Sequence, residues 1–317
     1  MIDALLRWAR ERGYSVAWGP AEVVQEARAE IARRHASAEL DEEFYRGELQ
    51  ALARGEPLRD CGTVVVVSMP RPAHLIGFEV DGARFEALLP PTYFRYRQTF
   101  EEVRQDLETS GLAGARVEHF VWPLKAVAAR LGLVRYGRNN IAYAEDFGSY
   151  MQLCGYLTGA RLPVPQGWSP CEPELLAECE NCAACLAACP TGAIGDDRVL
   201  LHGERCLTHL NENAGEWPAG LPGSSHHCMI GCLLCQRICP ANPELPIERT
   251  ALSFSAADTR SLLGESAPDG YGPETGIRHK LAWLGQPAMG DVLGRNLRAL
   301  MAARGAVQAA SRATSTR

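Results

Sequence analysis

The stretch CENCAACLAACPTG, residues 179–192, places four cysteines three, three and four residues apart and follows the last with a proline. A Cys-x2-Cys-x2-Cys-x3-Cys-Pro run of this kind binds cubane 4Fe-4S clusters, with three thiolates on one cluster and the fourth on a neighbouring cluster. The two-residue gaps let thiolates of one tight turn reach three irons on one face, while the fourth points away. The stretch therefore predicts half of a double-cluster module.

A second copy of the run follows, without its first cysteine, as Cys232-x2-Cys235-x3-Cys239-Pro240. Exchanging the last cysteine of each run predicts one group of ligands, the first set: Cys179, Cys182, Cys185 and Cys239. The second set then contains Cys189, Cys232, Cys235 and one cysteine displaced from the expected spacing. Cys206 and Cys228 are both candidates for this last ligand.

Zinc is the alternative metal, because Cys-x2-Cys pairs also form zinc ribbons. Zinc sites do not require two Cys-x3-Cys-Pro endings that exchange ligands. The pattern therefore favours two 4Fe-4S clusters. Clusters with interlocked ligands lie close together, and the module is therefore predicted to conduct electrons. Three cysteines have no partner at cluster spacing and are predicted to be small buried residues: Cys61, Cys154 and Cys171.

The cellular location is predicted from the N-terminus and from hydropathy. MIDALLRWARERG lacks the long apolar core and the small-residue cleavage site of a secretory signal. The sequence also contains no run of about 18 apolar residues that could span a membrane. The 12 cysteines thus point to metal binding rather than to disulfides, and we expect a cytoplasmic protein without membrane contact.

Residues 1–165 alternate helical patterns with apolar strands and predict a mixed α/β domain. The first helix is expected to end at Gly13, with Ile2, Leu5, Leu6 and Ala9 on its apolar side. The valines of CGTVVVVSMP, residues 61–70, predict a strand buried on both faces. A capping box, Thr99-Phe-Glu-Glu102, predicts a helix that begins at Thr99, and another helix is expected from Pro123 to Gly132.

The prolines of LPVPQGWSP, residues 162–170, predict a linker between the α/β domain and a cluster module at 171–250. The third part, 251–317, is expected to hold a loop over 253–276 and then a helix. Seven Lys or Arg residues against one Asp give residues 277–317 a net charge of +6. Such charge can bind nucleic acid, but the spacing of several residues also predicts an ordinary amphipathic helix: Val292, Leu293, Leu297, Leu300 and Met301.

Two segments upstream of the cysteines resemble epoxyqueuosine reductases. LGLVRYGRNN, residues 131–140, is similar to the Gly-Leu-Gly-x-x-Gly-Lys-Asn segment of that family. FGSYMQLCGYLT, residues 147–158, is similar to its Gly-Ser-x-x-x-Leu-Gly-x-Leu-Leu-Thr segment. The cluster module resembles the family in CPTGAI (189–194), RCLT (205–208) and GCLLCQRICP (231–240).

The resemblance implies an α+β protein with a nitroreductase-like α/β core that holds cobalamin, a ferredoxin-like double 4Fe-4S module and a short helical tail. It implies an oxidoreductase related to reductive dehalogenases, and it favours Cys206 over Cys228 as the last ligand. Small and polar residues of the two upstream segments are then expected to contact the corrinoid: Gly137, Arg138, Asn139, Gly148 and Ser149. The alternative for these residues is a plain turn between two strands.

The sequence departs from the family at two places. Where the family has a proton-donating aspartate in a Val-Asp-Ser segment, this chain has Glu118 within Val117-Glu-His-Phe120, and His119 is a second candidate. A surface carboxylate is the alternative reading of Glu118. The family also carries a helical-repeat C-terminus that helps to hold transfer RNA, whereas about 65 residues follow the clusters here. The expected substrate is therefore a small molecule or tRNA.

Together these features predict a reductase that passes electrons from an external ferredoxin- or flavodoxin-type donor through two clusters to cobalamin. The expected reaction is a two-electron reduction that removes oxygen or halide from the substrate. Two alternatives would use the same cysteines. One is a ferredoxin-like electron carrier without corrinoid, and the other is a protein that reductively activates the corrinoid of a different protein.

Overall fold

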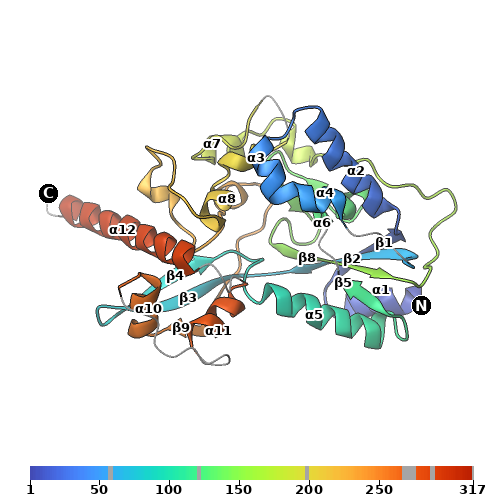
Figure 1. Ribbon diagram of the computed structural model, residues 1–317, viewed down its shortest axis with the longest axis horizontal. Helices are drawn as coiled ribbons and strands as arrows, with labels where there is room; N and C mark the ends of the chain where they lie inside the picture. The colour runs from blue at the N-terminus through green and yellow to red at the C-terminus, as the bar shows by residue number, and fades with distance from the viewer. Residues whose placement is uncertain (56–59, 120–122, 197–199, 266–275, 286–289, 316–317) are drawn as a thin grey trace.

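The computed structural model describes residues 1–55, 60–119, 123–196, 200–265, 276–285 and 290–315, with the backbone alone from 305 onward. One lobe is built on an antiparallel sheet, sheet A, with the strand order β1-β2-β8-β5 (Figure 1). Its strands are β1 (Ser15–Pro20), β2 (Thr63–Pro70), β8 (Met151–Thr158) and β5 (Val117–His119). The valine run thus forms a central strand, as predicted.

Helices cover both faces of sheet A. This explains why the four valines of β2 follow one another without polar residues between them. On one face Val64 and Val66 pack against α2 (Val23–Ala36) and α6 (Leu124–Arg130). On the other face Val65 and Val67 pack against α1 (Ile2–Glu11) and α5 (Tyr96–Asp106). All four valines are fully buried, so each removes its side chain from water at a gain of about 1.5 to 3 kcal/mol.

A second sheet, sheet B, joins parts of the chain that are far apart in sequence (Figure 1). Its order is β4-β3-β9, where the hairpin of β3 (Ala73–Val80) and β4 (Ala83–Leu89) pairs in parallel with β9 (Ile247–Phe254). Three C-terminal helices pack on it: α10 (Ala256–Leu262), α11 (Ile277–Trp283) and α12 (Gly290–Ser315). The boundary that composition predicts at residue 250 therefore falls within a strand of this sheet.

The cysteine-rich region consists of short helices and turns between the two lobes (Figure 1). It contains α7 (Ala184–Ala188), α8 (Leu207–Glu212), α9 (Leu234–Arg237) and 3-10 turns at Ala177–Cys179, Gly203–Arg205 and Gly223–Ser225. A small hairpin of β6 (Arg135–Tyr136) and β7 (Ala142–Tyr143) reaches it from the α6 side. Between α2 and β2 lie α3 (Glu42–Phe44), a π-helical turn (Tyr45–Leu49) and α4 (Gln50–Arg54).

Two local expectations are wrong. The helix predicted to begin at Thr99 begins at Tyr96, and the N–H of Thr99, which is buried, donates to the carbonyl of Arg95 at 2.8 Å. Arg95 adopts a left-handed conformation (φ 56°) that starts the helix one turn early, so no capping box forms. In α1, Leu6 is exposed whereas Trp8 is buried and donates to Asp106, because the helix faces α5 through Trp8.

The loop predicted over 253–276 is also wrong in its first part. Residues 253–254 complete β9, and Ser255 caps α10 through a capping box with Asp258. The remainder of that segment, 266–275, lies outside the described residues. The predicted apolar side of the last helix is confirmed, since Leu293, Leu297 and Leu300 are buried against sheet B, Met301 is partly buried there, and Val292 is buried as well. Over the described ranges, no helix combines the length and the apolar character needed to cross a membrane.

Candidate iron-sulfur site and the recess beside it

The four thiols predicted for the first set line a single small pocket. Cys179 ends a 3-10 turn, Cys182 follows it, Cys185 lies within α7, and Cys239 follows α9. Because α7 and α9 pack against each other, the last cysteine of the second run reaches the first three of the first run. No cysteine of the other set lines this pocket. This is the exchange of ligands that the two sequence runs predict.

The second set gathers Cys189, Cys206, Cys232 and Cys235. Burial, together with the neighbouring thiols of Cys206 and Cys189, raises the pKa of Cys232 to about 12. Burial also raises the pKa of Cys235, with contributions from Cys232 and Cys206. Since mutual repulsion requires proximity, these four thiols share one region, and binding of iron would have to displace their protons.

Cys228 is placed differently from Cys206. It is 2% exposed and packs with Ala73, Leu88 and Leu233 in a small apolar cluster. Its pKa is raised well above the usual value, chiefly by burial. The Cys232 thiol adds to this rise, so Cys206 and Cys228 both lie near the second set, but Cys228 packs among apolar side chains whereas Cys206 also lies near Cys189. Within the described part of the chain, no three His, Cys, Asp or Glu side chains converge tightly enough to hold one metal ion.

The turn of residues 137–140, which we call the GRNN turn, contacts the thiol of Cys179 in the first set and the backbone of Cys235 in the second. The backbone N–H of Arg138 donates to Sγ of Cys179 at 3.4 Å, and its guanidinium donates to the Cys179 carbonyl at 3.0 Å. Nδ2 of Asn139 donates to the hydroxyl of Tyr143 at 2.9 Å and to the carbonyl of Cys235 at 3.5 Å. The turn thus connects the α/β lobe to the first set through Cys179 and to the second through Cys235.

Gly148 and Ser149 also lie against the cluster module. The N–H of Ser149 donates to Oδ1 of Asn242 at 2.7 Å, and its hydroxyl donates to Oε1 of Gln236 at 2.9 Å. Gly148 has φ +60°, and a Cβ there would collide with the Asn242 side chain, so glycine permits this close approach. The residues expected to contact the corrinoid therefore make contacts with the cysteine module. Nε of Arg138 is buried and has no hydrogen-bond partner among the described residues.

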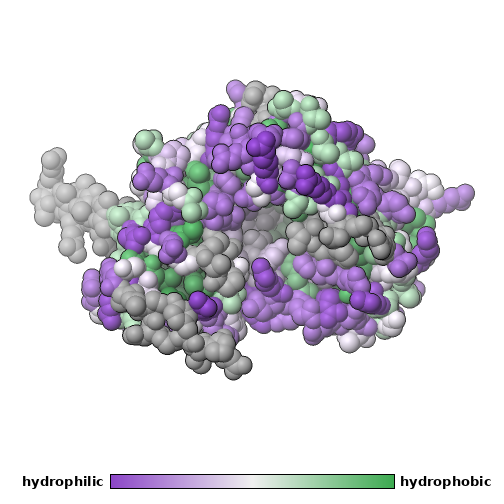
Figure 2. Space-filling model, viewed as in Figure 1, coloured by the Kyte–Doolittle hydropathy of each residue, from purple (hydrophilic) through white to green (hydrophobic). Residues whose placement is uncertain are grey.

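An open recess lies beside the second set, at the side chain of Lys125. Lys125 is exposed to solvent, yet desolvation lowers its pKa to about 8, while the Cys206 thiol acts in the opposite direction. The ammonium is therefore reached by solvent while many protein atoms surround it. Figure 2 shows a hollow near the centre of the face in view, between the two lobes.

Near Cys228 and Cys206, a partly buried pair of residues connects the loop between β4 and α5 to the cysteine module. The hydroxyl of Tyr93, in the loop between β4 and α5, donates to Oε1 of Glu212 in α8. Burial raises the pKa of both groups, and the Cys206 thiol contributes to the rise at Tyr93. Gly231, with φ +68°, leaves the space that the Tyr93 ring occupies. Neither Lys125 nor this pair is predictable from the sequence, because only the fold brings them to Cys206.

Glu118 and His119 lie on the edge strand β5. The Glu118 carboxylate pairs with Arg116 at 2.8 Å, and its side chain is 42% exposed. The His119 ring lies 4.2 Å from the ring of Phe100, and desolvation there lowers its pKa. Phe120, the last residue of the predicted proton-donor segment, lies outside the described residues. Among those described, no hydrogen bond or ion pair joins Glu118 or His119 to either set of thiols.

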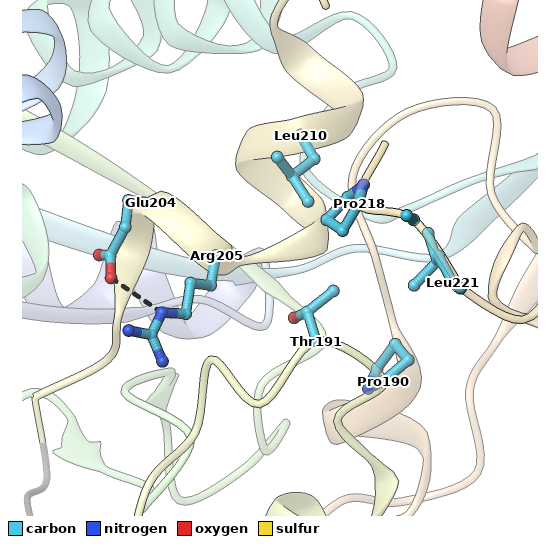
Figure 3. A pocket seen from close by; sticks show the side chains of 9 residues that line it. Pro190, Thr191, Glu204, Arg205, Leu210, Pro218 and Leu221 are labelled. Atoms are coloured by element: carbon cyan, nitrogen blue, oxygen red, sulfur yellow. Dashed lines mark ion pairs between the residues drawn. The ribbon is translucent and has the colours of Figure 1, made fainter. Parts of the chain in front are cut away.

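A separate cavity of about 370 Å³ lies on the outer side of the second set (Figure 3). Pro190 and Thr191, which follow Cys189, form one wall, and Leu210, Pro218 and Leu221 form another. Its charged groups pair with each other, since Glu204 and Arg205 lie 3.4 Å apart. The hydroxyl of Thr191 lies 3.7 Å from Sγ of Cys189 and helps to lower the pKa of that thiol. The cavity thus borders a predicted ligand but presents no unpaired charge.

The two sets of thiols define an iron-sulfur protein with a double-cluster module. A family model described as a 4Fe-4S double cluster binding domain matches residues 178–242. The match covers all eight predicted ligands. The rest of the chain lies outside this match and is compared with other proteins below.

Those relatives are epoxyqueuosine reductases. The chain is 32% identical over 120 residues to the epoxyqueuosine reductase of Bacillus subtilis, covering 37% of this chain and 28% of that protein. It is 34% identical over 146 residues to that of Synechocystis sp., covering 46% of each. The aligned part thus spans less than half the length of these curated relatives. The resemblance predicted from the sequence is confirmed, and the relatives are oxidoreductases by name.

Solved structures show the same fold over nearly the whole chain. A selenomethionine-labelled epoxyqueuosine reductase matches with a TM-score of 0.61 and 18% identity, covering 95% of this chain and 81% of that one. A second, solved with an epoxyqueuosine-modified tRNA-Tyr stem loop, matches with a TM-score of 0.62 and 17% identity, covering 95% and 80%. The mixed α/β fold with a double-cluster domain is therefore that of the epoxyqueuosine reductase structures.

Proposed function

We propose that this protein is an iron-sulfur oxidoreductase that acts in the manner of its epoxyqueuosine reductase relatives. The first set of thiols holds one 4Fe-4S cluster, and Cys189, Cys206, Cys232 and Cys235 hold the other. An external ferredoxin- or flavodoxin-type donor supplies the electrons. The observation that supports this proposal most strongly is the GRNN turn, which contacts one cysteine of each set, Cys179 and Cys235, and carries the residue that anchors Lys125.

We further propose that the recess accommodates a cobalamin on a nitroreductase-like core. Two observations fit such a group: the recess lies beside the second set, and Nε of Arg138 is a buried donor without a partner, which a corrinoid side-chain amide could accept from. Arg138 and Asn139 would hold the group, and the buried contacts of Ser149 keep the wall of the site rigid. When bound, the corrinoid supplies a strongly reducing cobalt centre for a two-electron reduction with loss of oxygen or halide.

The proton for such a reaction would come from the segment of Glu118 and His119. Of these two, His119 is the better candidate, because the Glu118 carboxylate is already paired with Arg116 at the surface. The His119 ring is held against Phe100 at one edge of sheet A, and its lowered pKa keeps a neutral imidazole at pH 7. A neutral imidazole can relay a proton from solvent to a substrate oxygen.

The substrate is either tRNA or a smaller molecule. One solved relative binds a tRNA stem loop, whereas several basic side chains of the tail here make internal contacts. Arg295 donates to the carbonyl of Leu210 at 2.7 Å, and Arg298 donates to that of Leu263 at 2.7 Å. Arg304 stacks over Phe85. Because these guanidinium groups hold helix α12 in place, they contribute less to an exposed basic surface, and a smaller substrate is favoured.

The decisive experiment is anaerobic expression with cobalamin supplied, followed by measurement of iron, sulfide, cobalt and the visible spectrum. About eight irons and one cobalt per chain are expected. Eight irons without retained cobalt would refute the corrinoid site and leave a ferredoxin-like carrier or an activator of another protein's corrinoid. The carrier deserves this test because Gly148 and Ser149 already make their contacts with the cysteine module. Zinc in place of iron would refute both.

A further inference from the structure

Lys125 delivers an unpaired positive charge to the recess. Its ammonium donates to the backbone carbonyl of Asn140 at 2.6 Å and to Oδ1 of the same residue at 3.0 Å. Both acceptors are neutral, and no ion pair joins Lys125 to a carboxylate within the described ranges. The ammonium also lies 5.6 Å from the centre of the Tyr136 ring. Its position is therefore fixed while its charge is not cancelled.

Asn140 shapes this anchor through its backbone. It adopts a left-handed conformation (φ 58°), which asparagine tolerates better than most residues other than glycine. As a result, the carbonyl and the side-chain oxygen of one residue both reach the same ammonium. A sparsely populated conformation at this place is maintained by the hairpin of β6 and β7, which encloses the GRNN turn.

The anchored charge lies beside the second set of thiols. Asn139, the residue before Asn140, donates to the carbonyl of Cys235 at 3.5 Å. The Cys206 thiol lies close enough to Lys125 to act on it electrostatically. The first set has a different neighbour, because there the GRNN turn offers the backbone N–H of Arg138 to Sγ of Cys179. One turn of the α/β lobe therefore presents the N–H and the guanidinium of Arg138 to the first set and anchors the ammonium of Lys125 near the second.

We propose that Lys125 is a positioning residue that raises the reduction potential of the second cluster. Reduction adds one negative charge to a cluster, so a nearby ammonium stabilises the reduced form more than the oxidised form. In a partly desolvated recess, water screens this interaction less than it does at an open surface. Lys125 thus favours an added electron on the second cluster. This inference rests on the proposed ligation of two clusters but not on cobalamin.

The test is a potentiometric titration followed by electron paramagnetic resonance on the anaerobically purified chain, with iron and sulfide measured for every sample. Lys125→Met removes the charge, Lys125→Arg retains it, and Asn140→Asp keeps the lysine but cancels its field. We expect Lys125→Met and Asn140→Asp to shift one of two midpoint potentials to more negative values. The same signal should be missing from Cys206→Ser, and Lys125→Arg should stay at the wild-type value.

Two results would overturn the proposal. Either both potentials remain where they are in Lys125→Met and Asn140→Asp, or both clusters shift together, which would indicate a general change of structure. Loss of the second cluster from both of these variants would likewise show that Lys125 is needed for assembly rather than for the potential. Neither substrate nor cobalamin enters the titration, so a protein that retains no cobalt can still show the expected shift.

Discussion

The two sets of thiols derive from two copies of one cysteine run, yet the fold gives them different surroundings. The first set encloses a small pocket beside Arg138, Asn139 and Tyr143 and receives a backbone N–H at Cys179. The second set borders the recess with the charge of Lys125 and lies near the buried pair of Tyr93 and Glu212. The spacing of the cysteines determines which thiols can bind each cluster. The neighbouring elements determine how strongly each cluster is stabilised when it gains an electron.

The largest expected effect breaks the second set and leaves the first intact. Cys206→Ser should lose about half of the bound iron and reduce turnover to background, because a cubane needs four protein ligands. Cys228→Ser, the matched control, should keep both clusters, since Cys228 packs among apolar side chains. Iron and sulfide analysis with electron paramagnetic resonance distinguishes the variants. The reverse pattern would exchange the roles of Cys206 and Cys228.

A second substitution, at Asn139, is expected to destabilise both sets of thiols. Asn139 is 2% exposed, and its amide bridges Tyr143 of the first pocket and Cys235 of the second set. Asn139→Ala should lower the free energy of unfolding by about 1 to 3 kcal/mol, because buried hydrogen-bonding groups lose their partner. Thermal unfolding and the rate of iron loss to a chelator measure this. Asn181→Ala, an exposed site within the first run, should behave as wild type.

Acid should weaken the second set before the first. The neutral His227 ring donates from Nδ1 to the carbonyl of Ser225 at 2.7 Å and accepts the N–H of Leu233 at Nε2, 3.0 Å away. Burial lowers its pKa below the ordinary value of about 6.5. The unfolded chain therefore binds the proton more readily. The stability contributed by neutral His227 is present above about pH 6.5 and is lost as the pH falls through the lower folded value.

This pH dependence can be followed by the decay of each paramagnetic signal between about pH 7 and 5. The signal assigned to the second cluster should disappear first, because Leu233 lies between Cys232 and Cys235. In His227→Gln the two signals should disappear at more similar pH values, since glutamine does not titrate in this range. Equal loss of both signals in the wild-type protein would contradict the assignment of His227 to the second set.

The smallest expected effect concerns Glu118, which contacts neither set. Its ion pair with Arg116 is solvent-exposed and contributes less than about 1 kcal/mol. Glu118→Gln should leave stability, iron content and turnover within about twofold of the wild-type values. His119→Gln should lower turnover more than Glu118→Gln while both clusters are retained. Full turnover in His119→Gln would remove the proton-relay role from this segment.

Much of the chemistry could be predicted from local spacing. The cysteine runs predict the pocket of the first set, including the contribution of Cys239 from a distant run. The valine run predicts the central strand of sheet A, because a strand without polar residues must be buried on both faces. These features follow from short-range patterns, in which side-chain chemistry and period alone decide the outcome.

The predictions from local patterns were wrong where contacts beyond the local pattern determine the structure. The capping box at Thr99 is overridden because Arg95 starts the helix earlier, and Trp8 replaces Leu6 on the buried side of α1 through its contact with α5. Sheet B pairs β3 with β9, which lie on opposite sides of the cysteine module in sequence. No local sequence pattern predicts such a pairing, because its stability comes from hydrogen bonds and apolar contacts between segments that are far apart in the sequence.

The sequence by itself determined that eight cysteines can hold two 4Fe-4S clusters, that the central strand is buried, and that the chain resembles epoxyqueuosine reductases. Only the tertiary structure decided that Cys228 packs among apolar side chains while Cys206 lies near Cys189, and that Lys125 lies near Cys206. The physical reason is that ligation depends on spacing along one turn. The electrostatic environment of a cluster depends instead on every charge and dipole that the folded chain brings within a few ångströms.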